Sequence, residues 1–173
     1  VTSDGRVVAF ESTSTTMAPD DFNSAPDLFV REVDTGTASL ISSRVGLPSA
    51  TAFANPMPGS ISADGRYLAY ASHDLGSSIG DTNGVQDIFV RDVETGLVQS
   101  VSVDSVGRFT NQFHSQGCVL SADGRRVAWI VVTPGYYGSS SVHWRDLTTG
   151  ETRVVSEMFA NLGAYRYSRP AIS

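Results

Sequence analysis

One short segment recurs along this chain at nearly equal intervals. Residues 62–66 read S-A-D-G-R, residues 121–125 are identical, and residues 2–6 are a near copy. The aspartates at positions 4, 64 and 123 are therefore separated by 60 and 59 residues. A fixed period of this size is typical of repeat architectures, in which each repeat is one supersecondary unit. This period constrains the fold more than any single residue does.

Further blocks recur with the same period, and each is short, apolar and bounded by Gly, Asp, Ser or Pro. Such blocks predict β-strands rather than helices. We name the four strands of a unit A to D. Strand A is at 59–62 in the second unit, at 118–121 in the third and at 170–173 in a further unit. In the first, second and third units, B is at 7–10, 67–70 and 127–129, C is at 27–33, 87–93 and 142–147, and D is at 38–42, 98–102 and 152–156.

The turns between these blocks predict antiparallel hairpins. Asp-Gly between strands A and B predicts a type I′ turn, because Gly supplies the positive φ that such a turn needs. The Asp/Glu-Thr-Gly segment between C and D predicts a slightly longer hairpin. Each unit is then a four-stranded antiparallel meander.

A four-stranded meander repeated every 50 to 60 residues predicts an all-β fold, a partial β-propeller of about three blades. We assign residues 1–173 to one propeller segment, with blade units 1–58, 59–116 and 117–168, and with 169–173 as the first strand of a further blade. Because propellers have about four to eight blades and the chain begins at Val1, we expect it to be an excerpt of a longer protein. A complete three-unit protein is the alternative.

Composition excludes several classes of function. The net charge of −6 argues against nucleic-acid binding through a basic surface, and all twelve basic residues are Arg. The single cysteine, Cys118, allows neither an internal disulfide nor a Cys-based zinc site, and we expect it to be a small core residue. No run of 18 apolar residues occurs, so we expect no membrane insertion.

Residues 61–70, I-S-A-D-G-R-Y-L-A-Y, and residues 80–92, G-D-T-N-G-V-Q-D-I-F-V-R-D, resemble the TolB-like, WD-repeat-like propeller repeats of bacteria. The resemblance covers nearly the whole chain and is weakest in the third unit. It implies a propeller in a periplasmic or extracellular protein, often a binding module and sometimes an accessory domain beside a prolyl-oligopeptidase-type hydrolase. Its motifs mark turns and strands, and they name no functional site.

No catalytic constellation emerges from the motifs. Residues 76–80 fit G-x-S-x-G around Ser78, but they lie in a Ser/Gly-rich loop without the following helix that a nucleophile elbow requires. Residues 121–124 place Gly directly after Asp, unlike the S-x-D-x-G-x-T-W box of sialidase-type propellers, so Trp129 is expected to be a core aromatic. We predict no catalytic residue, no resident metal and no cofactor.

Two sets of side chains raise the question of a metal. Asp81, Asn83 and Asp87 have the alternate spacing with which a calcium loop begins, and Asp21, Asn23 and Asp27 repeat it, but the bidentate Glu of such a loop is absent. Asx turns that order the loop are the alternative. The three histidines, at positions 73, 114 and 143, show no ligand spacing, and we expect them to be packed or edge residues.

The lengths of the connections predict a binding face. In a meander, the A–B and C–D turns share one end of the blade, and here they are tight and alike. The B–C loops (12–26, 72–86, 132–141) and D–A loops (43–58, 103–116, 157–169) share the other end and differ from one another. A rigid scaffold that positions variable loops is the usual setting of a binding site.

From these loops we expect a non-catalytic interaction module for a protein or peptide partner. Alternatives are an accessory domain of a hydrolase whose catalytic domain lies elsewhere, and a carbohydrate-binding propeller. Exposed aromatic residues could take part, namely Tyr136, Tyr137, Tyr165 and Tyr167 beside Arg166, although packing over blade edges is the alternative. Unpaired strand edges and apolar outer faces also predict self-association, towards a six-blade ring or into aggregates.

Overall fold

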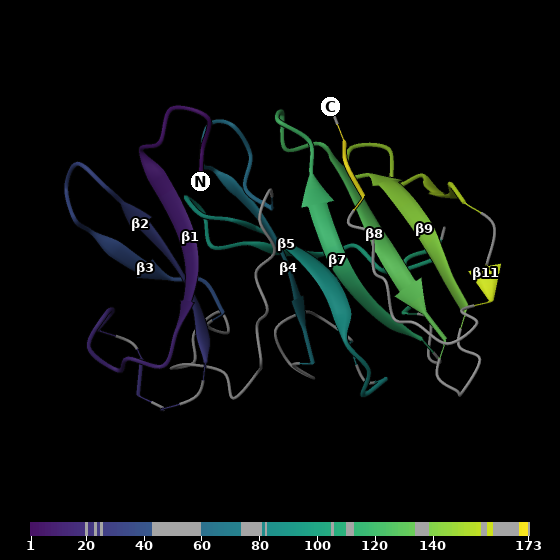
Figure 1. Cartoon of the computed structure of the whole chain (residues 1–173), viewed down its shortest axis with the longest axis horizontal. Coiled ribbons are helices and arrows are strands. Elements are labelled where there is room, and N and C mark those ends of the chain that lie inside the picture. Colours follow the sequence, from purple (N-terminus) through teal and green to yellow (C-terminus); the bar gives the residue numbers. More distant parts are fainter. Residues whose placement is uncertain are drawn as a thin grey trace.

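The described part of the chain is built from β-strands. The computed structural model describes residues 1–19, 21–22, 24, 26–42, 60–73, 81, 83–104, 106–109, 113–133, 139–156, 159–160 (main chain only) and 170–172. In these residues the regular structure consists of three antiparallel sheets that lie side by side along the molecule (Figure 1). The search of these residues finds no helix that is long and apolar enough to cross a membrane.

The first two sheets have the same order and register. The first contains β1 (Val7–Ser12), β2 (Asp27–Glu32) and β3 (Ala38–Leu40). The second contains β4 (Tyr67–Ser72), β5 (Asp87–Asp92) and β6 (Val98–Ser100). In both, strand B pairs with C and C with D, so that Val8 faces Arg31 and Leu68 faces Arg91. Equal register at equal repeat positions follows from the equal spacing of the turns.

Strand A of the second sheet is reduced to one antiparallel bridge between Ile61 and Leu68. The order of the four strands predicted at 59–62, 67–70, 87–93 and 98–102 is confirmed: Ile61 bridges Leu68, β4 pairs with β5, and β5 pairs with β6. The first sheet thus has the three strands B, C and D predicted for it, whereas the second has three rather than four in the described residues, because its strand A contributes only one bridge.

The third sheet carries the four expected strands and one more. It contains β7 (His114–Leu120), β8 (Arg126–Val132), β9 (Ser139–Asp146) and β10 (Thr152–Val154), and the two-residue β11 (Phe159–Ala160) pairs with the start of β9. The ladder between β7 and β8 is interrupted between Gln116 and Val119, where Gly117 has φ 62°. Residues 114–116 and 159–160, expected in loops, thus belong to strands. Residues 170–172, expected in a strand, have no ladder partner among the described residues.

The predicted type I′ turn at Asp-Gly is wrong. No non-glycine residue in the described part of the chain has positive φ, so Asp64 cannot occupy a type I′ turn. Instead the Gly65 N–H donates to the Ser62 carbonyl, the Ser62 N–H donates to the Tyr67 carbonyl, and only Gly65 is left-handed, with φ 77°. The Asp64 carboxylate accepts from the Ser62 hydroxyl and the Arg66 N–H, which favours a type I turn closed by glycine.

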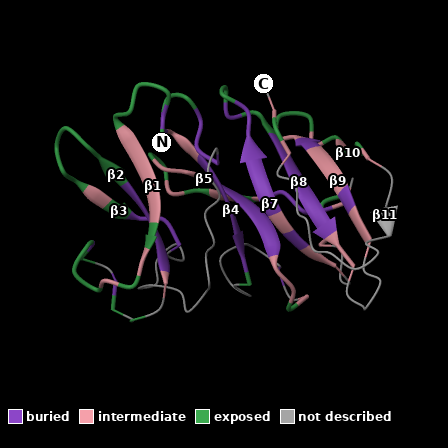
Figure 2. Ribbon diagram, viewed as in Figure 1, coloured by how far each residue is buried: buried purple, intermediate pink, exposed green. Residues whose placement is uncertain are grey.

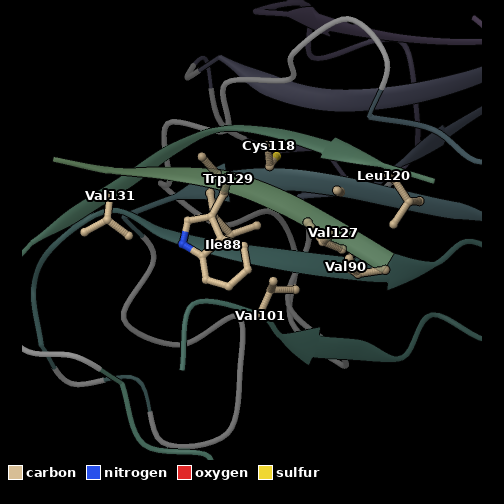
Figure 3. Close-up of a cluster of buried hydrophobic side chains, with 10 residues drawn as sticks. Ile88, Val90, Val101, Cys118, Leu120, Val127, Trp129 and Val131 are labelled. Atoms are coloured by element: carbon tan, nitrogen blue, oxygen red, sulfur yellow. The ribbon is translucent and has the colours of Figure 1, made fainter. Parts of the chain in front are cut away.

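Apolar side chains fill the two spaces between neighbouring sheets. Figure 2 shows that the central strands β4, β7 and β8 are mostly buried, whereas β1 is only half-buried. Between the second and third sheets, aliphatic residues of β5 and β8 surround Cys118 and Trp129 (Figure 3). Cys118 is fully buried, as expected, and burial raises the pKa of its thiol to about 12. A sheet that is apolar on both faces is what a stack of blades requires.

Candidate functional site

Strands B end and strands C begin at one end of every blade, which we call the long-loop end; the A–B and C–D turns form the opposite, tight-turn end. At the long-loop end, one residue pair repeats in the first two blades. The Ser42 hydroxyl donates to Asp27, and the Ser102 hydroxyl donates to Asp87, each at 2.5 Å. Each serine oxygen also accepts from the N–H of the residue after its aspartate, at 3.0 and 2.9 Å. These pairs fasten the end of strand D to the start of strand C.

Asp81 and Asn83, of the segment considered for calcium, form Asx turns, which were the alternative: Asp81 Oδ1 accepts from the Asn83 N–H at 3.3 Å. The Asn83 side-chain amide donates to Asp87 Oδ2 at 2.7 Å, while Asn83 Oδ1 accepts from the Val85 N–H at 2.9 Å. With Ser102 on its other oxygen, Asp87 accepts from one donor at each carboxylate oxygen. In the described residues no group of three or more His, Cys, Asp or Glu is placed to hold a metal. Asn23 of the first blade lies outside the described residues.

Burial dominates the electrostatics of this loop. Asp87 is fully buried, and the loss of hydration raises its pKa to about 6, with a smaller contribution from the charge of Asp81. The hydrogen bonds from Ser102 and Asn83 act in the opposite direction. Burial of the ionised Asp87 carboxylate therefore costs free energy of folding. Its hydrogen bond from Asn83 orders the B–C loop of the second blade.

A pocket opens at the long-loop end between the second and third blades. Its volume is about 400 Å³, and its lining is mostly apolar: Ser102, Val103, Phe113, Trp129, Val131, Ser141, His143 and Val154. Ser102 and Val103 follow β6 of the second blade, Phe113 precedes β7, and the other residues belong to β8, β9 and β10 of the third blade. A concave apolar surface with a few polar groups is the usual form of a ligand site.

The pocket exists where the third blade departs from the repeat. His143 occupies the position of Phe29 and Phe89, and Ser141 occupies that of Asp27 and Asp87. Both replacements are smaller. In the second blade Phe89 contacts Tyr70 and Phe109, with ring centroids 5.7 and 6.3 Å apart, and is fully buried. In the third blade the smaller His143 lines the pocket at the position of Phe89.

The polar groups of the pocket form a short contact. Ser141 Oγ and His143 Nε2 lie 2.9 Å apart, and the imidazole packs against Trp129 with ring centroids 5.5 Å apart. Burial lowers the pKa of His143, so the ring is neutral at pH 7. Trp129 is the buried aromatic that the sequence predicts, and its indole Nε1 has no hydrogen-bond partner in the described part of the chain.

Ser141 and His143 have the geometry of a nucleophile beside a base, which sequence reasoning missed. Catalysis by such a pair also needs a group that orients the imidazole and donors that stabilise an oxyanion. No carboxylate accepts a hydrogen bond from His143 Nδ1 among the described residues.

The other two histidines lie at the ends of different strands and contact each other. His73 at the end of β4 and His114 at the start of β7 meet across the blade boundary, with ring centroids 5.6 Å apart. The Gln86 N–H donates to His114 Nδ1 at 3.3 Å, which occupies one of the two ring nitrogens. Partial burial, followed by the charge of His114, lowers the pKa of His73. Packing of β4 against β7 brings them together, and nothing in the sequence spacing signals it.

Several predicted candidates fall outside the described residues, namely Ser78 with its G-x-S-x-G segment, Tyr136, Tyr137, Tyr165, Arg166 and Tyr167.

The described residues also line two further hollows. One of about 640 Å³ lies in the B–C loop of the first blade, lined by residues that include Met17 and Phe22. The other, of about 590 Å³, lies at the tight-turn end between Tyr67, Gln99 and Arg125.

Comparison with known proteins supports the architecture. No protein-family model matches the chain, and no curated protein matches it. Among solved structures, a putative TolB from Agrobacterium tumefaciens aligns with 92% of this chain and 48% of its own, at 13% identity and TM-score 0.57. TolB from Acinetobacter baumannii aligns with 90% of this chain and 31% of its own, at 18% identity and TM-score 0.50.

The β-propeller domain of the Trilobed protease from Pyrococcus furiosus aligns with 95% of this chain and 43% of its own, at 16% identity and TM-score 0.55. The chain thus spans less than half the length of these structures. With its three antiparallel sheets, the chain is a partial β-propeller. Its fold is TolB-like, and at these identities the likeness concerns the fold alone.

Proposed function

We propose that this chain is an interaction module that binds a protein or peptide partner at its long-loop end, with one partner side chain seated in the pocket between the second and third blades. The observation that carries the proposal is the pocket itself: about 400 Å³, mostly apolar, and lined by His143 where the repeat has phenylalanine. An apolar pocket that accepts one anchoring side chain is a common centre of a protein interface.

The polar groups of the pocket determine which kind of partner side chain can bind in it. The neutral His143 and the Ser141 hydroxyl offer one donor and one acceptor beside an otherwise apolar wall. An aromatic or aliphatic side chain with a polar tip, such as tyrosine or methionine, matches this lining. Binding without turnover is part of the proposal, because the described residues supply no orienting acid for the Ser141–His143 pair.

A second candidate is an accessory domain of a hydrolase. Structures with a similar fold include the propeller domain of the Trilobed protease and proteins from a study of two prolyl endopeptidases, the latter at 18% identity and TM-score 0.55. In that case the long-loop end would face a catalytic domain. A location in the periplasm or outside the cell remains part of the proposal, on the resemblance of the repeats.

Selection from a random peptide display library tests the proposed function. The immobilised chain should enrich peptides that share one large side chain, and His143→Phe should lose them, because the phenylalanine of the other blades fills the pocket. Gln99→Ala, at the tight-turn end, is the control that should retain them. Enriched peptides that bind His143→Phe as well as the unaltered chain would refute the role of the pocket, and absence of enrichment would refute peptide binding.

A further inference from the structure

Each blade pairs one aromatic side chain of strand B with one of strand C, and the third blade does so with two nitrogen-containing rings. The pairs occupy equal register positions in the ladders and are Phe10 with Phe29, Tyr70 with Phe89, and Trp129 with His143. Their ring centroids are 5.8, 5.7 and 5.5 Å apart. The third blade therefore keeps the aromatic contact of the repeat and adds ring nitrogens to it, at the wall of the pocket between the second and third blades.

The indole N–H of Trp129 is a donor without an acceptor. Trp129 is 2% exposed, and its Nε1 is buried with no hydrogen-bond partner in the described part of the chain. A buried tryptophan usually donates its N–H to a partner, because an unpaired buried donor has lost its hydrogen bond to water without replacement. Trp129 departs from this pattern at a place where a ligand can supply the missing acceptor.

The unpaired N–H lies on the pocket side of the indole. Figure 3 shows the nitrogen on the edge of the ring that is nearer Val131, with Val127 and Val101 toward the opposite edge. The residues that line the pocket include Val131 but neither Val127 nor Val101. A side chain that fills the pocket therefore meets the donor edge of Trp129.

The other polar groups of the pocket already have partners. Ser102 both donates and accepts a hydrogen bond within the second blade. Ser141 Oγ and His143 Nε2 lie 2.9 Å apart and share one hydrogen bond. Because an indole nitrogen donates and does not accept, an ammonium or a guanidinium group finds no partner at Trp129. A side chain with an apolar body and an acceptor at its tip satisfies both the donor and the apolar walls.

We propose that Trp129 makes the pocket selective for a tyrosine side chain of the partner, whose phenol oxygen accepts from the indole N–H. This inference rests on the proposed function, in which one partner side chain is seated in this pocket. The phenol ring supplies the apolar body that Val103 and Phe113 can contact. Its hydroxyl hydrogen can be donated to Ser141 Oγ, which retains a lone pair whichever group donates in its contact with His143.

The unpaired donor also determines which anchors are rejected. Phenylalanine matches the apolar walls but leaves the Trp129 N–H buried and unpaired, and a site of this kind discriminates against the analogue that lacks the hydroxyl. Methionine fits the walls as well, but its thioether sulfur is only a weak acceptor. Tyrosine is therefore preferred to both, although it is the most hydrated of the three in water.

Nuclear magnetic resonance of the ¹⁵N-labelled chain tests the hydrogen bond, with p-cresol as the probe for tyrosine and toluene as the probe for phenylalanine. The chain has two tryptophans, so it has two indole N–H resonances, and Trp129→Phe identifies one of them by removing it. p-Cresol should move the Trp129 indole proton downfield, whereas toluene should not. The Trp144 indole is the internal control, because Trp144 does not line the pocket, and its resonance should stay in place.

The relative affinity of the two probes tests the selectivity. Titration followed at the main-chain amides of Val131 and Ser141 should show that p-cresol binds about tenfold more tightly than toluene. A pocket without a hydrogen-bond partner would favour toluene, because the phenol loses more hydration on burial. Trp129→Phe should reverse the preference, and Gln99→Ala, at the tight-turn end, should keep it.

The first blade indicates that Trp129→Phe retains the fold, since Phe10 stacks there on Phe29 at the equivalent position. If this variant does not fold, the spectra and affinities of the unaltered chain still decide. Equal or tighter binding of toluene, a p-cresol complex in which neither indole proton moves, or no binding of either probe would each overturn the proposal. Displayed peptides that share phenylalanine or methionine and lose binding to His143→Phe would support the proposed function and refute the tyrosine selectivity.

Discussion

At the scale of single residues, aspartate carboxylates accept hydrogen bonds that stabilise the loops and turns of each repeat. Asp87 accepts from Ser102 on one oxygen and from Asn83 on the other, and it orders the start of strand C. Asp64 plays a similar part at the tight-turn end, where it accepts from Ser62 and from the Arg66 N–H. The first carboxylate is buried and its pKa is raised, whereas the second is exposed and its hydrogen bonds lower its pKa.

The raised pKa of Asp87 predicts a specific pH dependence. A carboxyl whose pKa rises from 3.8 to about 6 on folding stabilises the fold fully below about pH 4 and loses that contribution as the pH rises through about 6. The stability of the unaltered chain relative to Asp87→Asn should therefore fall between pH 4 and pH 7, by on the order of 2 kcal/mol. Urea denaturation of both proteins across this range measures it. A difference that stays constant or grows with pH would contradict the account.

An alanine substitution at Gly124 should cause a steric clash that the same substitution at Gly5 does not cause. Both Gly124 and Gly5 end an A–B turn with positive φ, at 73° and 74°. A Cβ at Gly124 would lie 2.4 Å from Tyr67 Cδ2 of the neighbouring blade, whereas one at Gly5 would meet nothing within 4 Å. Gly5→Ala should cost about 1 kcal/mol for the backbone alone, and Gly124→Ala about 1–3 kcal/mol more. Equal losses in urea denaturation would show that the blades do not meet at Tyr67.

At the scale of elements, serine residues join strand D to strand C in all three blades. Ser42, Ser102 and Ser156 each lie 15 residues after the equivalent position near the start of strand C, which is residue 27, 87 or 141. Each accepts from a main-chain N–H of strand C, and the first two also donate to an aspartate. The short strands D are held by these side chains beyond their three-residue ladders.

Removal of the serine should therefore cost more in the second blade than in the third. Ser102→Ala removes the partner of the Ile88 N–H and of one Asp87 carboxylate oxygen, while Asn83 still donates to the other oxygen, and we expect a loss of about 2–3 kcal/mol. Ser156→Ala removes only the bond from the Val142 N–H, and we expect about 1 kcal/mol. Thermal unfolding of both variants compares them. The reverse order would show that the aspartate contributes little.

The sequence predicts strands B and C well because their signal is local. Alternation and the flanking turns place β4 and β5 almost to the residue. Strand A is harder, because its pairing depends on the neighbouring strand: it is a single bridge at Ile61 but a seven-residue strand at His114–Leu120. The turn type is missed because the Ser62–Asp64 hydrogen bond, which Asp-Gly alone does not reveal, favours negative φ at Asp64.

The sequence predicts at which end of the blades the candidate site lies, but it does not predict the pocket. Loop lengths indicate the long-loop end, and the pocket lies there. The pocket itself depends on contacts between blades, since Ser102 and Trp129 are far apart in the sequence. The repeats show His143 at the position where the other blades have phenylalanine. From the sequence alone we expect a packed or edge histidine there, not a pocket. A comparison of side-chain volumes at equivalent repeat positions could have found it.

At the scale of the whole molecule, the blades are joined by hydrophobic contact and by main-chain hydrogen bonds at both ends. The Ala63 N–H donates to the Ala122 carbonyl at 2.9 Å at the tight-turn end, and the Ser115 N–H donates to the Gln86 carbonyl at 2.7 Å at the long-loop end. The boundary between the second and third blades is therefore fixed on either side of the apolar core in Figure 3. A pocket at such a boundary is held by rigid elements, which suits binding.

The most direct test of the account is the hydrogen-exchange footprint of a peptide selected by the chain. We predict slower exchange at 102–103, 113–115, 129–131 and 141–143, which surround the pocket at the long-loop end, and unchanged exchange at 97–99, 123–125 and 147–148, which surround the hollow at the tight-turn end. The opposite pattern, with protection only at the tight turns, would contradict the assignment of the long-loop end as the binding face.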